Sequence, residues 1–175
     1  MEFNEVINNR RSIRRFESTP ISDETILTLI DAASKAPSWK NSQVSRYYVV
    51  KELRNEVISC LPDFNKMSVG DAPVLLVSTV IDKRSGYNRE GEYETHLKEG
   101  FSYFDNGLQI ENLCLKAYEQ GLGTLIMGLY NNEELRRVLE IPEEEIITVV
   151  IGLGYPAIKP EMPKRKELNT IVKFK

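Results

Sequence analysis

The chain has 175 residues, 41% of them hydrophobic and 28% charged, and its formal net charge at pH 7 is −3. This length suits one domain with a core of its own, and the acidic balance argues against a nucleic-acid binder that works through bulk positive charge. The N-terminal residues MEFNE lack the apolar stretch of a signal peptide, and no segment approaches the roughly 20 apolar residues of a membrane-spanning helix, so we expect neither.

The first half of the chain predicts two helices and then two strands. Phe3–Asn9 has the pattern of a short helix. Ser22 is a good N-cap for a second helix, whose apolar residues recur from Ile26 to Ala33 and which ends shortly before Pro37. The predicted strands are Val44–Lys51 and Pro73–Ile81, and the second is apolar enough to be central.

The second half predicts a long helix over Thr95–Gln120. Apolar residues recur along it at helical spacing on a wide surface, so we expect this helix to be buried on most sides, with Gly121 as its C-terminal cap. Its expected apolar stripe is Leu97, Phe101, Phe104, Leu108 and Leu115. Two further strands are predicted over 124–130 and Glu145–Leu153, with a short helix between them that starts at Asn131 or Asn132.

The segment 155–175 has three prolines in its first nine residues, and we expect it to form an extended tail. Neither repeats nor a linker divide the chain. We therefore predict a single α+β domain over residues 1–175, in which helices flank a mixed, mostly antiparallel sheet.

Four arginines lie between Arg10 and Arg15, in the stretch RRSIRRF. Guanidinium groups bind phosphate oxygens in pairs, and the hydroxyl of Ser12 would add one donor. The basic run Lys164–Lys166 near the other terminus could close on the same phosphate. A solvated basic patch is the alternative interpretation of the cluster.

The stretch APSWKNSQ, residues 36–43, offers hydroxyl and amide groups after the helix-breaking Pro37. Amides donate and accept hydrogen bonds, so they match the edge of a heterocycle, and Trp39 could stack on one. An ordinary polar loop is the alternative.

Two glycine pairs, at 121/123 and 152/154, do not fit a dinucleotide-binding fingerprint, because each lacks the third glycine and follows the wrong element. Gly128 lies inside the apolar run TLIMGLY, where a strand glycine indicates close approach by a ligand or another backbone. With only Cys60, Cys114 and His96, the chain lacks the residues for a His/Cys metal site. We expect two reduced thiols in a cytoplasmic protein.

Five blocks, in matching order and spacing, resemble the flavin-dependent nitroreductase family. They are RRSIRRF, APSWKNSQ, NGLQIENLCLKAYEQGLGTLIMG, IITVVIGLGYP and PKRKELNTIVKF, and they span nearly the whole chain. The resemblance implies a nitroreductase-like fold and a homodimer with FMN at the subunit interface. It also favours a cofactor site over a solvated patch for the arginines.

Residue by residue, the resemblance implies an FMN site. Arg14 would face the N1/O2 edge of the flavin, where positive charge stabilises the anionic reduced ring. Arg165, with Lys164, matches a C-terminal block that returns to the phosphate. The residues that match the family's first block, whose outer members bind the phosphate and ribityl chain, are Arg10, Arg11, Ser12 and Arg14.

The second block would reach the flavin ring from the partner subunit. Its residues here are Pro37, Ser38, Trp39, Asn41 and Gln43. The strand that passes the flavin N5 would be Ile126, Met127 and Gly128, with a backbone N–H near Gly128 as a hydrogen-bond donor. Asn65 is a further candidate, in a region whose length varies within the family.

The sequence departs from the family pattern at three places. Val44 and Ser45 replace a common Pro-Trp after Gln43, and Leu129 replaces a second glycine after Gly128. The polar segment 82–95 has little room for the helical lid of larger members. Contacts to the substrate in that segment are therefore unassigned.

The implied activity is the NAD(P)H-dependent reduction of nitroaromatics or quinones by ping-pong hydride transfer through FMN. No catalytic side chain is required, and we expect His96 to lie on the surface. Two alternatives stay open: a specialised member of the same fold (a reductive dehalogenase or a flavin-fragmenting enzyme of cobalamin ring synthesis) and a flavin-binding module without turnover. Single-stranded nucleic-acid binding is disfavoured by the acidic total.

Overall fold

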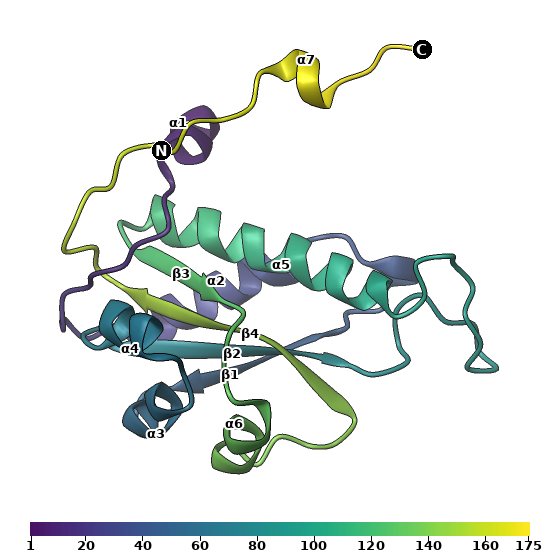
Figure 1. Ribbon diagram of the computed structural model, residues 1–175, viewed down its shortest axis with the longest axis horizontal. Coiled ribbons are helices and arrows are strands. Elements are labelled where there is room, and N and C mark those ends of the chain that lie inside the picture. The colour runs from purple at the N-terminus through teal and green to yellow at the C-terminus, as the bar shows by residue number, and fades with distance from the viewer.

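In the computed structural model, which describes residues 1–175, a four-stranded sheet lies between two layers of helices (Figure 1). The strands are β1 (Ser45–Val50), β2 (Val74–Ile81), β3 (Gly123–Met127) and β4 (Glu145–Gly154), in the order β1-β2-β4-β3. All neighbouring strands are antiparallel. The predicted α+β class is therefore confirmed, but the only parallel pairing is an isolated bridge between Ser12 and Thr124.

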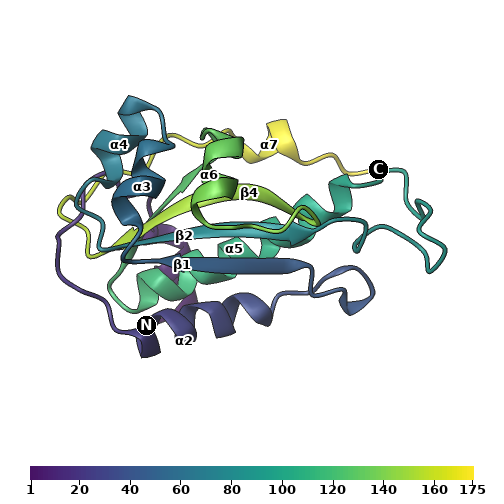
Figure 2. The ribbon, with the colours of Figure 1, turned by 90° about the horizontal axis from the view of Figure 1, so that it is seen from below.

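Strand β2 is buried on both faces, as its apolar sequence predicts. Its alternating side chains enter two separate cores: Leu75 and Val77 face one, whereas Val74 and Leu76 face the other. A register shift between Ser78 and Thr79 marks a bulge against β4. The sheet thus separates two helical layers, seen edge-on in Figure 2 with α2 on one side and α3, α4 and α6 on the other.

The first layer contains α2 (Asp23–Ser34) and α5 (Gly100–Glu119). The predicted N-cap is confirmed, because the Ser22 side chain accepts a hydrogen bond from the Thr25 N–H at 3.1 Å. The predicted C-terminal cap of α5 is confirmed too. Gly121 has φ +76°, its N–H donates to the Tyr118 carbonyl at 2.9 Å, and the next N–H donates to the Ala117 carbonyl at 2.8 Å.

The second layer contains α3 (Arg54–Ser59), α4 (Asp63–Val69) and α6 (Asn132–Val138). Helix α6 starts where the sequence predicts, because the Asn131 side chain accepts from the Glu134 N–H at 3.2 Å. The sequence analysis missed α3 and α4. Both have at most seven residues and bury one or two side chains each, so their periodicity is too short to read.

Helix α5 differs from its prediction at its start and on its buried face. It begins at Gly100 rather than Thr95, because Lys98 adopts φ +51° within a turn. Phe104, predicted to be in the core, is 54% exposed. The side chains buried in this half of the helix are polar: Ser102, Asp105, Asn106 and Gln109. The prediction that α5 is buried on most sides is therefore wrong for the single chain.

Helix α1 has its predicted bounds, Phe3–Asn9. Residues 155–167 contain no helix, and they lead to the short α7 (Leu168–Ile171). Figure 1 shows α1 and the segment that carries α7 extending beyond the layer of α5. The predicted surface position of His96 is confirmed. None of the helices has the length and apolar composition that crossing a membrane requires.

Candidate functional site

The arginine-rich stretch forms an extended arm, residues 10–17, that lies between β3 and the start of the C-terminal segment. The Ile13 N–H donates to the Thr124 carbonyl of β3 at 2.9 Å. On the other side, the Glu17 N–H donates to the Tyr155 carbonyl at 2.9 Å, and the Ala157 N–H donates to the Arg15 carbonyl at 3.0 Å. These bonds bring the two ends of the chain together.

Glycines of β3 and β4 allow the arm to pack this closely. A Cβ on Gly123 would lie 3.0 Å from the Ile13 Cβ, and one on Gly154 would lie 3.0 Å from a ring carbon of Phe16. Ile13 and Phe16 are the buried side chains of the arm. One glycine of each pair, Gly123 and Gly154, therefore makes room for the buried side chains of the arm.

With Ile13 and Phe16 fixed in the core, the polar side chains of the arm line a cavity of about 170 Å³ together with the C-terminal segment. The lining residues are Arg10, Arg11, Ser12, Arg14, Pro160, Glu161, Pro163 and Arg165. Four guanidinium groups thus share one small cavity with a single carboxylate. Such a cavity suits a phosphate group.

The four arginines of the cavity differ in their partners. Arg10 pairs with Glu111 of α5, with 3.3 Å between its Nε and Oε1. Arg11 donates from Nη1 to the carbonyl of Arg10 at 2.7 Å, but its buried Nε has no partner. Neither Arg14 nor Arg165 takes part in any of the seven ion pairs of the chain. The cavity therefore contains unpaired donors for an anion.

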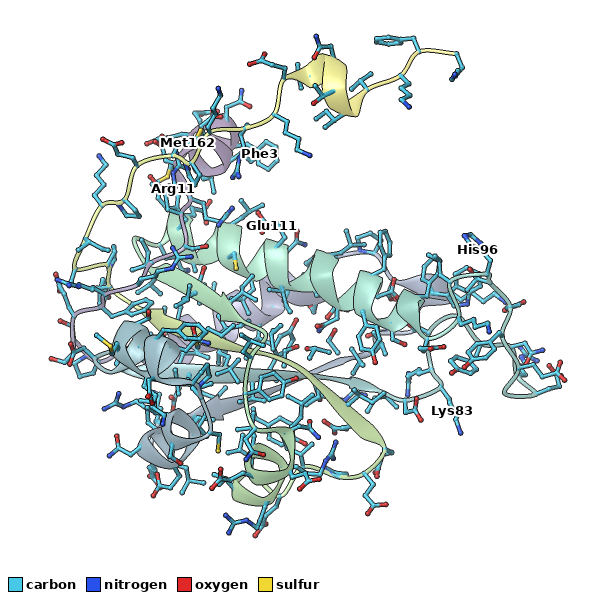
Figure 3. The ribbon with its side chains drawn as sticks, in the orientation of Figure 1. Phe3, Arg11, Lys83, His96, Glu111 and Met162 are labelled. Carbon is cyan, nitrogen blue, oxygen red and sulfur yellow. The ribbon has the colours of Figure 1, made fainter.

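The second predicted block lies elsewhere in the chain. It forms a loop around a short 3-10 helix, Trp39–Asn41, next to the N-terminal half of α5. Figure 3 shows Arg11 at one end of α5 and Lys83 beyond the other end. Lys83 precedes Arg84, whose Nε donates to the carbonyl of Ser42 in this loop. Within one chain, the structure therefore does not bring Pro37, Ser38, Trp39, Asn41 and Gln43 to the arginine cavity.

The remaining predicted residues are also spread out. Asn65 is buried in α4, and Lys164 is exposed but absent from the cavity lining. Ile126 is 45% exposed, whereas the Met127 side chain belongs to the core. Gly128 was predicted inside a strand, but β3 ends one residue earlier.

The end of β3 has open space around it. A Cβ on Gly128 would meet no atom within 4 Å, and the Gly128 N–H donates to no carbonyl of the chain. Thr124, which pairs with the arm, lies four residues away, or about 13 Å along an extended strand. A groove of about 340 Å³ between α5 and this strand includes Ile126. The surface of β3 thus connects the arginine cavity to an accessible backbone donor.

The structure adds polar residues that the sequence analysis missed. The Oδ2 atom of Asp105 accepts hydrogen bonds from the backbone of Trp39 at 2.9 Å and from the side chains of Ser42 and Ser85. Asn106 donates to the hydroxyl groups of Ser45 and Ser78, both at 2.8 Å. The signal in the sequence was a polar stripe at helical spacing, positions 102, 105, 106 and 109, inside an otherwise apolar helix.

The thiols offer no reactive group to this site. Cys114 is buried beside a larger hollow that the arm, α5 and the C-terminal segment enclose. Burial raises the pKa of the Cys114 thiol to about 11, so it stays protonated at neutral pH. Burial also raises the pKa of Cys60. Both cysteines are free and buried.

Comparison with known sequences identifies one family and relatives with related names. The profile of the nitroreductase family matches residues 7–69 and 61–155. A protein of Methanothermobacter thermautotrophicus, provisionally named NADH dehydrogenase/NAD(P)H nitroreductase, is 30% identical over 168 residues, which cover 91% of this chain and 80% of the relative. The NADPH-flavin oxidoreductase of Vibrio harveyi is 29% identical, with coverages of 96% and 71%. Iodotyrosine deiodinase 1 of Rattus norvegicus is 28% identical, with coverages of 98% and 68%.

Solved structures share the fold. A nitroreductase family protein from Streptococcus pneumoniae superposes with a TM-score of 0.89 at 22% identity, covering 99% of this chain and all of the other. A protein from Exiguobacterium sibiricum, provisionally described as a nitroreductase and solved in complex with FMN, superposes with a TM-score of 0.86 at 20% identity, with coverages of 100% and 98%. At these identities the two likenesses establish the architecture.

Proposed function

Because the chain belongs to the nitroreductase family, we propose that it is an FMN-dependent oxidoreductase that uses NADH or NADPH to reduce electron-poor acceptors such as nitroaromatics or quinones. The observation that carries this proposal is the cavity in which arginines from both ends of the chain meet. A phosphate monoester at one end of a ligand is the group that such a cavity suits. The names of the relatives, which are NAD(P)H-linked, support the choice of electron donor.

Three features of the chain fit FMN. The buried Nε of Arg11 lacks a partner that a phosphate oxygen would supply. The Gly128 N–H donates to no carbonyl of the chain, a Cβ at this residue would meet no atom within 4 Å, and a ring nitrogen could accept a hydrogen bond there. The buried Nε1 of Trp39 is a third donor without a partner. These donors lie in three of the segments to which the sequence resemblance assigned the cofactor.

In this proposal, Arg10, Arg11 and Ser12 of the arm would hold the phosphate together with Arg165, and the β3 surface would support the ring. When bound, FMN would supply the redox chemistry by accepting a hydride from the reduced nicotinamide and passing electrons to the acceptor. The protein would bind and orient the reactants and exclude water. Arg14 would stabilise negative charge on the ring through its guanidinium group, without transferring a proton.

We further propose a homodimer in which the loop 37–43 of each subunit completes the flavin site of the other. Within one chain that loop lies away from the arginine cavity, so a second copy is needed to bring Asn41 and Gln43 to the ring. Unpartnered apolar side chains support a large subunit interface. They are exposed on α1, α5 and the C-terminal segment: Phe3, Ile7, Tyr103, Phe104, Leu168, Ile171, Val172 and Phe174.

Size-exclusion chromatography with light scattering and visible absorbance tests this proposal. The purified protein should elute as one yellow peak with the mass of two chains. Addition of NADH or NADPH without oxygen should then bleach the flavin absorbance, and a quinone should restore it. A colourless monomer that does not bind added FMN would contradict the proposal. A yellow protein that neither nicotinamide bleaches would favour a flavin-binding module without turnover.

Reductive dehalogenation is a second candidate, supported by the similarity to the rat deiodinase. The same reduced protein, mixed with an iodinated phenol, distinguishes the two. Release of iodide at a rate well above the rate of quinone reduction would favour the second candidate.

A further inference from the structure

A buried carboxylate organises the two loops at the N-terminal end of α5. Asp105 is 1% exposed, and its Oδ2 atom alone accepts three hydrogen bonds. The Trp39 N–H donates at 2.9 Å, the Ser42 hydroxyl at 3.3 Å and the Ser85 hydroxyl at 2.5 Å. Two of the donors belong to the loop 37–43 and the third belongs to the segment 82–99.

The loop 37–43 holds an unfavourable backbone conformation. Lys40, Asn41 and Gln43 have φ values of +47°, +56° and +48°, so half of the six non-glycine residues with positive φ in the whole chain lie within four positions. Few residues other than glycine and asparagine adopt this region, so a cluster of three needs support from the surrounding structure. The bonds from Trp39 and Ser42 to Asp105 flank Lys40 and Asn41, and the Ser38 hydroxyl accepts from the Gln43 N–H at 3.2 Å.

Further contacts join the segment 82–99 to this loop. The Arg84 Nε donates to the Ser42 carbonyl at 2.7 Å. Lys40 pairs with Glu94, with 2.5 Å between Nζ and Oε2. At the base of the segment Gly86 has φ +85°, and a Cβ there would lie 2.7 Å from the Lys98 carbonyl oxygen. The two loops therefore form one packed unit, to which Asp105 provides the only buried charge.

We propose that Asp105 is a positioning residue that presets the loop 37–43 for the flavin and, through Ser85, joins the segment 82–99 to that loop. The inference rests on the proposed function, because that function gives the loop its ligand. It extends that function to a residue outside the ligand contacts. The side chains of Asn41 and Gln43 can pair with a ring edge only if their backbone is held in the observed conformation, and Asp105 is the group that holds it.

The single tryptophan of the chain gives a direct reporter. The Trp39 backbone bonds to Asp105, and its ring packs on Phe101 with centroids 4.7 Å apart. Loosening of the loop should expose the indole and increase quenching of its fluorescence by acrylamide. This measurement needs no flavin, so it can be made on the flavin-free protein.

The experiment compares Asp105→Asn, Ser85→Ala and the matched control Ser78→Ala. Both serines are fully buried, and each bonds to one of two adjacent side chains of α5, Asp105 or Asn106. Each variant is measured for acrylamide quenching of Trp39, FMN affinity, thermal unfolding, and kcat and KM with 1,4-benzoquinone.

Asp105→Asn should increase quenching and weaken FMN binding about tenfold, because neutral acceptors form weaker hydrogen bonds than charged ones. Ser85→Ala should increase quenching less than Asp105→Asn does, because it removes one of the three hydrogen bonds to the carboxylate and leaves both bonds to the loop 37–43. Ser78→Ala should lower thermal stability and leave Trp39 quenching, FMN affinity and KM as in the wild type.

The proposal is overturned if Asp105→Asn lowers thermal stability but keeps wild-type quenching and FMN affinity. It is equally overturned if Ser78→Ala exposes Trp39 as much as Asp105→Asn does, since the effect would then be general destabilisation. If the wild type binds no FMN, the proposed function fails, and the quenching comparison still decides whether Asp105 holds the loop.

Discussion

At the level of single residues, the arginines of the arm are not equivalent. Arg10 is engaged by Glu111, Arg11 is half-buried with a free Nε, and Arg14 has no partner within the chain. The sequence predicted the residue types, and the family resemblance, not the cluster alone, favoured a phosphate site over a solvated basic patch. It could not predict which of them face the cavity: Lys164 lies outside the lining, whereas Arg165 is part of it.

Replacement of Arg14 by alanine should weaken FMN binding about tenfold and slow flavin reduction by NADH, because one charge-assisted hydrogen bond is lost. The fold should change little, since Arg14 is exposed and unpaired. Titration of the flavin-free protein with FMN, followed by the quenching of flavin fluorescence, gives the affinity.

The neighbouring Arg15 is the matched control for Arg14→Ala. Its side chain is also exposed, and it does not line the cavity. Arg15→Ala should therefore bind FMN within about twofold of the wild type, because surface substitutions away from a site have small effects. An equal loss of affinity in both variants would show that the arm acts only through its total charge.

At the level of elements, the sequence predicted those segments whose ends carry a local signal. Ser22, Asn131 and Gly121 mark helix ends that the structure confirms. The start of α5 could not be predicted, because the positive φ of Lys98 depends on tertiary contacts that include Gly86. The end of β3 was misplaced for the same kind of reason. The strand pairing stops after Met127. The Tyr130 hydroxyl then donates to the Ile147 carbonyl, and the Asn131 N–H donates to the Cys60 carbonyl at the end of α3.

The packing of the arm on β3 gives a prediction at this level. Gly123→Ala should displace the arm, because the new Cβ would lie 3.0 Å from the Ile13 Cβ. We expect a loss of about 1–3 kcal/mol in the free energy of unfolding, together with weaker FMN binding, although residue 123 touches no ligand. Chemical denaturation and an FMN titration measure the two effects.

Gly100→Ala is the control for this packing effect. In α5 the added Cβ would meet only the Leu97 Cβ at 3.8 Å, an ordinary contact. This variant should be neutral or slightly more stable, by up to about 1 kcal/mol, because alanine favours a helix. If Gly123→Ala behaved like Gly100→Ala, the close packing of the arm would not be what positions the arginines.

At the level of the whole molecule, the fold leaves its flavin-facing segments apart. The arm and residues 160–165 line one cavity near the C-terminal end of α5, whereas the loop 37–43 lies with the segment 82–99 at the other end of α5 (Figure 3). The sequence order alone could not reveal this division, because pairing between distant segments depends on the sheet and on the glycines that admit the arm. Two chains would be needed to complete each proposed site.

The central claim is that the arginines from both ends of the chain bind a phosphate. FMN and riboflavin share the same ring and differ in that phosphate, so their dissociation constants for the flavin-free protein test the claim most directly. At least two charge-assisted contacts predict that FMN binds about 100-fold or more tightly than riboflavin. Equal affinities for the two flavins would contradict the account.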